Sequence, residues 1–254
     1  MDLGLKEKKV LITGGTSGIG YAAAKEFRRE GAFVTVVGRT HILYEVANQD
    51  WENTFNEKLC FQQLDVSGPS AANELYRCSG VVDILINNAS NVPSGYLEDF
   101  TAEDIEKAFN SKMMAYIKIM SEYLPEMIKQ ESGAICNVIG IAAVKPRANY
   151  ALGGMCNAAL KSVTHAYGAR SLPQGVSVFG VNPGRTMTAR LIKHLKFEEE
   201  LRQKNMLSAE PLQNISFIDP EEIARMIVFG CSPLMKHLSG SVVDYDGGAL
   251  YRPT

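Results

Sequence analysis

The chain has 254 residues, a formal net charge of −2 and a hydrophobic fraction of 46%. This length and ordinary composition predict a single domain over residues 1–254 rather than a disordered or fibrous chain. The near-neutral charge gives no electrostatic reason to expect nucleic-acid binding, so small-molecule partners are favoured. No segment approaches about 18 consecutive apolar residues, and residues 1–10 lack the apolar core of a signal peptide. We therefore expect no membrane partner and a cytoplasmic location.

Short β-branched runs alternate with helical patterns along most of the chain. We expect strands at residues 9–13, 33–37, 59–64, 82–87, 134–139 and 177–181. We expect helices at residues 18–30, 101–129, 149–171 and 220–230. Such alternation is typical of parallel strands joined by crossover helices, and strands this apolar are covered on both faces. The sequence therefore predicts an α/β fold, a Rossmann-type doubly wound parallel sheet in a three-layer αβα sandwich.

A glycine-rich loop directly follows the first expected strand. Residues 13–20 read Thr-Gly-Gly-Thr-Ser-Gly-Ile-Gly and run into a helix. Glycines permit a tight turn and let the backbone approach a pyrophosphate, while the helix N-terminus offers free N–H groups. Alone, such a loop can also be simple turn chemistry. Together with the fold, it indicates a dinucleotide-binding domain.

The second expected strand ends in Gly38-Arg39, where NAD-specific sites often carry an acidic residue. An acid would repel a 2′-phosphate, whereas the forked donors of Arg39 suit one. We therefore expect NADP(H) as the cofactor, with NAD(H) less favoured. The alternative is that Arg39 is a solvent-facing loop residue.

Further motifs follow along the chain: Asp65-Val66, Asn87-Asn88-Ala89, Asn110, and Pro183-Gly184 with Thr186 and Thr188. In their order these motifs resemble those of the short-chain dehydrogenase/reductase family over essentially the whole chain. The resemblance, with the glycine loop and Arg39, implies cofactor contacts at Gly14, Thr16, Ser17, Gly18, Ile19, Gly20, Arg39, Asp65, Val66, Asn88, Ala89, Asn157, Pro183, Gly184, Thr186 and Thr188. Taken singly, each motif could be helix capping or turn punctuation.

The family's catalytic pattern is broken. In relatives a serine and a Tyr-x-x-x-Lys pair carry out proton transfer in carbonyl reduction. The corresponding positions fall on Gly140, Gly153 and Asn157, and of the four expected catalytic residues only Asn110 is present. General acid catalysis is worth about 10²- to 10⁴-fold in rate, so its loss would cripple a simple ketone reduction.

Tyr150 is the candidate substitute for the missing acid, because it lies about one helical turn before Gly153. Its ring could equally pack in the interior. We therefore expect Asn110, Tyr150 and Asn157 as the catalytic residues. If a tyrosine and a lysine from elsewhere in the chain occupied the places of Gly140, Gly153 and Asn157 beside the coenzyme, the argument for unusual chemistry would fail.

The primary functional hypothesis is an NADP(H)-dependent oxidoreductase with non-standard acid/base chemistry, which delivers hydride to a conjugated carbonyl or an iminium compound. Two alternatives remain: a non-redox isomerase or cyclase with a structural cofactor, and a catalytically inactive NADP(H) sensor or partner subunit.

Other features complete the expectations. The charged stretch after the last expected strand favours a substrate lid around residues 187–217, although such a run also suits a solvated helix face. The histidines have no metal-ligand spacing, and five scattered cysteines do not form a disulfide framework. The long helices at 101–129 and 149–171, rich in methionine at Met113, Met114, Met120 and Met127, suggest a homodimer or homotetramer, unless those methionines face the domain's own core.

Overall fold

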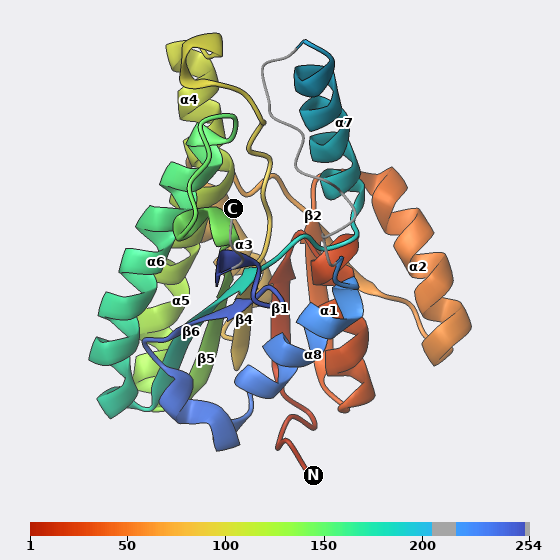
Figure 1. Ribbon diagram of the computed structural model, residues 1–254. Coiled ribbons are helices and arrows are strands. Elements are labelled where there is room, and N and C mark those ends of the chain that lie inside the picture. Colours follow the sequence, from red (N-terminus) through yellow and green to blue (C-terminus); the bar gives the residue numbers. More distant parts are fainter. Residues whose placement is uncertain (205–216, 252–254) are drawn as a thin grey trace.

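The computed structural model describes residues 1–204 and 217–251, which form a seven-stranded parallel sheet covered by helices (Figure 1). The strand order is β3-β2-β1-β4-β5-β6-β7. The strands are β1 (Lys9–Thr13), β2 (Phe33–Gly38), β3 (Cys60–Gln63), β4 (Ile84–Asn87), β5 (Gly133–Val138), β6 (Val176–Pro183) and β7 (Val242–Tyr245). The chain runs outward from β1 to β3 and then crosses to β4 on the other side of β1. The topological switch point therefore lies between β1 and β4.

The α-helices of the described residues cover both faces of the sheet. They are α1 (Gly18–Arg29), α2 (His41–Phe55), α3 (Ala71–Ser79), α4 (Ala102–Phe109), α5 (Ala115–Lys129), α6 (Ala151–Ser171), α7 (Ala189–Gln203) and α8 (Pro220–Gly230). Figure 1 shows α4, α5 and α6 on one side of the sheet and α1, α2 and α8 on the other. The predicted doubly wound αβα sandwich is confirmed.

Two hydrophobic cores follow from the alternation of side chains along each strand. In β1, Val10 and Ile12 point to the face that Phe27 of α1 covers. Leu11 points to the opposite face, against Tyr116 of α5. Because successive strand residues face opposite sides of a sheet, a strand that is apolar throughout serves both cores.

Four of the α-helices and strands in the described residues were not predicted from the sequence: α2, α3, α7 and β7. The amphipathic pattern of α2 is blurred because Ile42, Leu43 and Val46 are exposed on it. Strand β7 carries Asp244 within its four residues and none of them is fully buried, so it does not form an apolar run. These omissions did not affect the fold class, since the remaining strands and helices already alternate.

The helix predicted over residues 101–129 is interrupted by a π-helical turn at Asn110–Met114. Its first part, α4, begins with a capping box in which the Thr101 hydroxyl accepts a hydrogen bond from the N–H of Asp104. A π-turn inserts an extra residue into the helical spiral, and such turns occur frequently at functional sites. Within this turn Lys112 is buried.

The predicted lid and the predicted interface residues can be placed in part. Residues 189–203 of the expected lid form α7, and residues 205–216 lie outside the described part of the chain. Met120 and Met127 are buried in the domain's own core. None of the helices in residues 1–204 and 217–251 is both long enough and apolar enough to cross a membrane.

The close packing of α6 on β6 generates a stability prediction. A Cβ at Gly168 would lie 2.0 Å from the backbone nitrogen of Gly240 and 2.4 Å from the carbonyl oxygen of Val178. Gly168→Ala is therefore expected to lower the free energy of unfolding by about 1–3 kcal/mol, as overpacking does. Gly154→Ala on the same helix is the control, because its nearest contact would be the Ala142 oxygen at 3.6 Å. Equal urea midpoints for the two variants would contradict this account.

Candidate functional site

A cleft of about 1470 Å³ lies at the carboxyl edge of the sheet. Its walls are the loops that follow β1, β2, β4, β5 and β6, together with α4 and α7. In Figure 1, α4 and α7 rise above this edge on opposite sides. Ligands of open α/β sheets bind outside the carboxyl ends of the strands, next to the switch point. This cleft is therefore the candidate active site.

The glycine-rich loop is tied to the end of β4 by two side chains. The Thr13 hydroxyl accepts hydrogen bonds from the backbone N–H groups of Asn88 and Ala89, at 3.0 and 3.1 Å. The Asn88 side-chain amide donates to the carbonyl oxygens of Thr13 and Gly14, at 3.2 and 3.0 Å. A Cβ at Gly20 would lie 2.3 Å from the Gly14 oxygen, so this position requires glycine. These contacts fix the loop beside the first turn of α1.

The same end of the cleft has features that suit a dinucleotide with a 2′-phosphate. No side chain caps the N-terminus of α1, so its first N–H groups are available to an anion. The guanidinium of Arg39 lies 3.9 Å from the carboxylate of Asp65, and both side chains are half exposed. The Ser90 hydroxyl lines the cleft and is buried without a hydrogen-bond partner among the described residues. A buried, unsatisfied hydroxyl is consistent with a ligand that completes it.

Almost all the predicted site residues meet in this cleft. Those that line it are Gly14, Thr16, Ser17, Gly18, Ile19, Arg39, Asp65, Val66, Asn88, Ala89, Tyr150, Asn157, Pro183, Gly184, Thr186 and Thr188. Gly20 lies behind the loop, and Asn110 lies at the start of the π-turn. Neither of these two is among the residues that line the cleft.

Tyr150 fills the space that a side chain at Gly153 would need. A Cβ at Gly153 would lie 2.0 Å from both Cε1 and Cζ of the Tyr150 ring. Gly153 lies in the first turn of α6, where a glycine costs less than in a helix interior. The ring packs partly against a small core cluster, as one alternative supposed, yet it also lines the cleft. The resemblance assigns a tyrosine to position 153. The phenol ring of Tyr150, the residue just before the helix, therefore occupies the place where the Cβ of that tyrosine would lie.

The Tyr150 hydroxyl meets side chains from α7. It accepts a hydrogen bond of 2.7 Å from Nη2 of Arg190, which also donates to the Val92 carbonyl at 3.4 Å. Because a guanidinium only donates, the phenol proton remains available to another acceptor. The His194 ring meets the Tyr150 ring edge-on with centroids 5.6 Å apart, and its Nδ1 lies 2.7 Å from the Ser94 hydroxyl.

A buried carboxylate anchors α7 at this position. Glu198 forms ion pairs with Arg147 at 2.8 Å and Arg185 at 3.4 Å, and lies 3.2 Å from Nε2 of His194. Burial raises the pKa of the Glu198 carboxyl, but the hydrogen bond from His194 and the charges of Arg185 and Arg147 outweigh it, so the pKa falls to about 2. The ionised carboxylate thus links α7 to the loop before α6 and to the segment after β6.

Lys112 reaches Asn157 from the π-turn. Its Nζ lies 2.7 Å from Oδ1 of Asn157 and 2.5 Å from the carbonyl oxygen of Ile139. Burial, with a smaller contribution from the positive charge of Arg190, lowers the pKa of Lys112 to about 7. The position that the resemblance assigns to lysine therefore holds an asparagine that is bonded to a lysine from another helix.

Gly140 lines the cleft next to Asn157 and cannot easily carry a side chain. Its φ is +134°, a value that L side chains rarely adopt. Its N–H donates to Oδ1 of Asn182 at 3.1 Å, which holds the loop against β6. A Cβ at Gly140 would lie 3.0 Å from Nδ2 of Asn157. A serine here would strain the backbone and press on Asn157.

Sequence reasoning did not identify Lys112, Arg190, His194 or Ser94 as site residues. Lys112 lies in a helix whose pattern shows no break, so nothing local indicates that it turns inward. Arg190 and His194 lie on a charged helix that also suits a solvated surface. The only indication of Lys112 in the sequence was indirect: Asn157 stands where the family has a lysine, and the shorter side chain leaves room for a cation from elsewhere in the chain.

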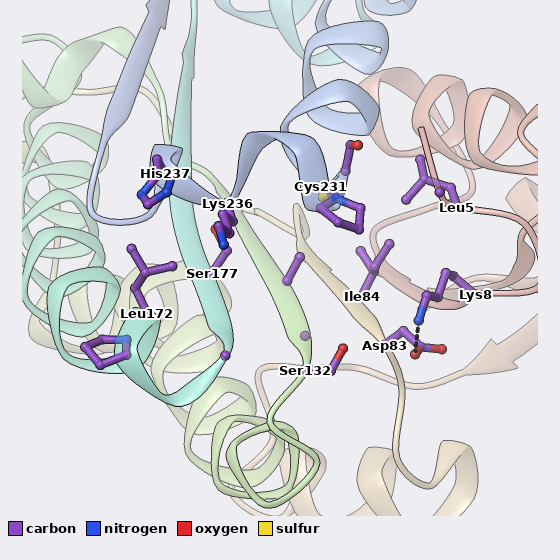
Figure 2. Close-up of a pocket in the computed structure, with 17 residues that line it drawn as sticks. Leu5, Lys8, Asp83, Ile84, Ser132, Leu172, Ser177, Cys231, Lys236 and His237 are labelled. Carbon is purple, nitrogen blue, oxygen red and sulfur yellow. Dashed lines mark hydrogen bonds and ion pairs between the residues drawn. The ribbon is translucent and has the colours of Figure 1, made fainter. Parts of the chain in front are cut away.

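A second cavity, of about 460 Å³, lies at the amino-terminal edge of the sheet (Figure 2). Figure 2 shows Lys8 beside Asp83, an ion pair of 3.1 Å, with Ser177 and Lys236 across the cavity. It is formed by the amino ends of β4, β5 and β6 and shares no lining residue with the cleft. Ligands of open α/β sheets bind at the other edge, so this cavity is not the candidate active site.

Comparison with known proteins identifies the family. The family model described as short chain dehydrogenase matches residues 8–199. The chain is 30% identical to the uncharacterized oxidoreductase YvrD of Bacillus subtilis, over 98% of this chain and 99% of that protein. It is 28% identical to the 3-oxoacyl-(acyl-carrier-protein) reductase FabG of Aquifex aeolicus, also over 98% of this chain and 99% of that protein.

Solved structures agree with these matches. The crystal structure of L-sorbose reductase from Gluconobacter frateurii, complexed with NADPH and L-sorbose, has a TM-score of 0.86 and 28% identity and covers 100% of both chains. A short chain dehydrogenase/reductase family protein has a TM-score of 0.85 and 29% identity, over 99% of this chain and 100% of that one. The chain therefore belongs to the short-chain dehydrogenase family of oxidoreductases.

Proposed function

We propose that this protein is an NADP(H)-dependent reductase of a small carbonyl or imine compound, in which Tyr150 donates the proton in place of the family's usual tyrosine. One observation carries the proposal: the Tyr150 ring takes the space of a side chain at Gly153 and binds Arg190 in the cleft. A conjugated carbonyl or an iminium is the preferred substrate within this class. Hydride addition to either leaves less charge on a single oxygen than addition to a simple ketone, so it demands less of the acid.

Several observations support NADP(H) over NAD(H). Gly38 and Arg39 place a cation and no acid at the end of β2, and Arg39 lines the cleft. The uncapped N-terminus of α1 and the unsatisfied Ser90 hydroxyl line the same cleft and suit either dinucleotide. The related L-sorbose reductase was solved with NADPH. When bound, this cofactor supplies the hydride.

The side chains around Tyr150 have distinct proposed roles. Tyr150 gives its proton to the atom of the substrate that gains negative charge. Arg190 holds the phenol oxygen, and its positive charge favours the phenolate that remains. Ser94 and His194, which are hydrogen-bonded to each other, hold the position of the Tyr150 ring through the edge-on contact of His194. Glu198 keeps His194 in place and ties α7 to Arg147 through its ion pairs.

Cofactor consumption separates this function from the two alternatives. The purified protein is mixed with NADPH and a panel of conjugated aldehydes and ketones, cyclic imines, 3-oxoacyl thioesters and ketoses. Loss of reduced nicotinamide absorbance in step with product formation is the expected result. Conversion without consumption would instead identify a non-redox isomerase or cyclase. NADPH binding without conversion of any compound would favour a sensor or partner subunit.

Removal of the cation at the end of β2 gives the second prediction. Arg39→Ala is expected to weaken NADPH binding by about tenfold or more, because charge-assisted hydrogen bonds contribute roughly 1.5–3 kcal/mol. NADH binding should stay nearly unchanged, since NADH lacks the 2′-phosphate. Fluorescence titration measures both dissociation constants. Arg77→Ala, at an exposed position of α3, is the control. An equal loss of affinity for both nucleotides would refute the role of Arg39.

Removal of the proposed acid gives the third prediction. Tyr150→Phe keeps the ring over Gly153 but deletes the proton donor, so kcat should fall by about 10²-fold or more. NADPH affinity should be nearly unchanged, because the ring still fills its space. Tyr167→Phe, on the exposed part of α6, is the matched control. Unchanged turnover in Tyr150→Phe would remove Tyr150 from the mechanism.

A further inference from the structure

The contacts of Lys112 fix the orientation of the Asn157 amide. The Asn157 atom that lies 2.7 Å from Nζ of Lys112 is the amide oxygen Oδ1, which the protonated amine can meet only as a donor. The amide nitrogen therefore points the other way, toward Gly140. Asn157 is only 2% exposed, and a buried amide held at one end has little freedom to turn over.

The amide nitrogen of Asn157 lies where a serine side chain would begin. The Cβ position of Gly140 is 3.0 Å from Nδ2 of Asn157, and both residues line the cleft. In the described part of the chain, the side-chain hydrogen bond of Asn157 is made through Oδ1 and none is made through Nδ2. Two N–H donors are thus available on the wall from which the serine has been lost.

From this geometry we infer that Lys112 and Asn157 act as one unit that binds the substrate's carbonyl oxygen or imine nitrogen beside Gly140. The inference rests on the proposed function and adds two residues to it. Asn157 donates the hydrogen bond through Nδ2, and Lys112 orients the amide through Oδ1. Asn157 is the contacting residue, and Lys112 is a positioning residue.

The unit assists reduction without a covalent step of its own. Hydride adds to the substrate carbon, the π-electron pair moves to the oxygen or nitrogen, and any proton required there comes from Tyr150. Preorganised donors aimed at an atom that gains negative charge stabilise the transition state more than the ground state. The positive charge of Lys112, when protonated, strengthens the donor by polarising the amide.

Asn157→Asp tests the unit most sharply. The aspartate has nearly the same shape and keeps the contact with Lys112, but it replaces the N–H donors by an oxygen that repels the substrate's developing charge. We expect kcat to fall by about 10²-fold or more, as on loss of an oxyanion donor, with little loss of thermal stability. Lys112→Met should lower kcat in the same direction while NADPH affinity changes little. Lys129→Met, on the exposed end of α5, is the control and should retain full turnover.

NMR titration of the lysine Cε groups provides a readout that does not need a substrate. One lysine should titrate near pH 7, and its signal should be absent from Lys112→Met. Arg190 of α7 and Cys156 of α6 are the charged and titratable groups that act on this amine, so its titration is compared in Arg190→Gln, where it should move upward. In Asn157→Asp it should also move upward, because the new carboxylate favours the ammonium.

The possible outcomes separate the two proposals. If the wild-type protein converts no carbonyl or imine compound with NADPH, the proposed function fails. If the wild-type protein is active and Asn157→Asp retains its kcat, the inference about the unit fails while the proposed function stands. If no lysine titrates below the ordinary value of about 10.4, Lys112 does not lie as described and the orientation of the amide is refuted.

Discussion

The hydrogen bonds of Thr13 and Asn88 across the gap between β1 and β4 set the geometry on which the cleft depends. The chain leaves these neighbouring strands in opposite directions, so the N–H groups of Asn88 and Ala89, just after β4, need partners outside the strand ladder. The Thr13 hydroxyl, which is fully buried, accepts two of them, and the Asn88 amide donates to two carbonyl oxygens of the glycine loop. Because both side chains are committed to the scaffold, the loop backbone and the start of α1 remain open toward the cleft.

On the opposite side of the cleft, the serine, tyrosine and lysine of the family pattern are absent. Side chains from elsewhere in the chain lie close to the positions that these three would occupy. Tyr150 lies over Gly153, Asn157 lies beside Gly140, and Lys112 is bonded to Asn157. A phenol and an amine from elsewhere in the chain therefore lie close to the places that the family pattern gives to its tyrosine and lysine. This proximity weakens the sequence-based argument for unusual chemistry and is consistent with acid/base groups that have been relocated.

The sequence predicted the architecture and the cofactor end of the cleft because both depend on local patterns. Apolar strands, a glycine loop before a helix and Asn88 after β4 can each be recognised from neighbouring residues. The proposed proton chemistry depends on contacts between distant segments, such as Arg190 with Tyr150 and Lys112 with Asn157. Only the absence of the family's side chains at Gly140, Gly153 and Asn157 drew attention to that part of the cleft, and it did not indicate which other residues lie there. Tyr150 could be proposed from the sequence because it is only three residues from Gly153.

The π-turn at Asn110–Met114 couples the rotation of one helix to the composition of the cleft wall. In an α-helix each residue advances the side-chain direction by about 100°, so one inserted residue changes the angular phase between α4 and α5. That phase decides whether an amine at position 112 faces the sheet or the surface. In a relative whose helix is uninterrupted, a lysine at the same position would point in a different direction, even if the neighbouring residues were identical. The length of one helical turn, rather than the identity of any side chain in it, would then separate proteins that can use this lysine from those that cannot.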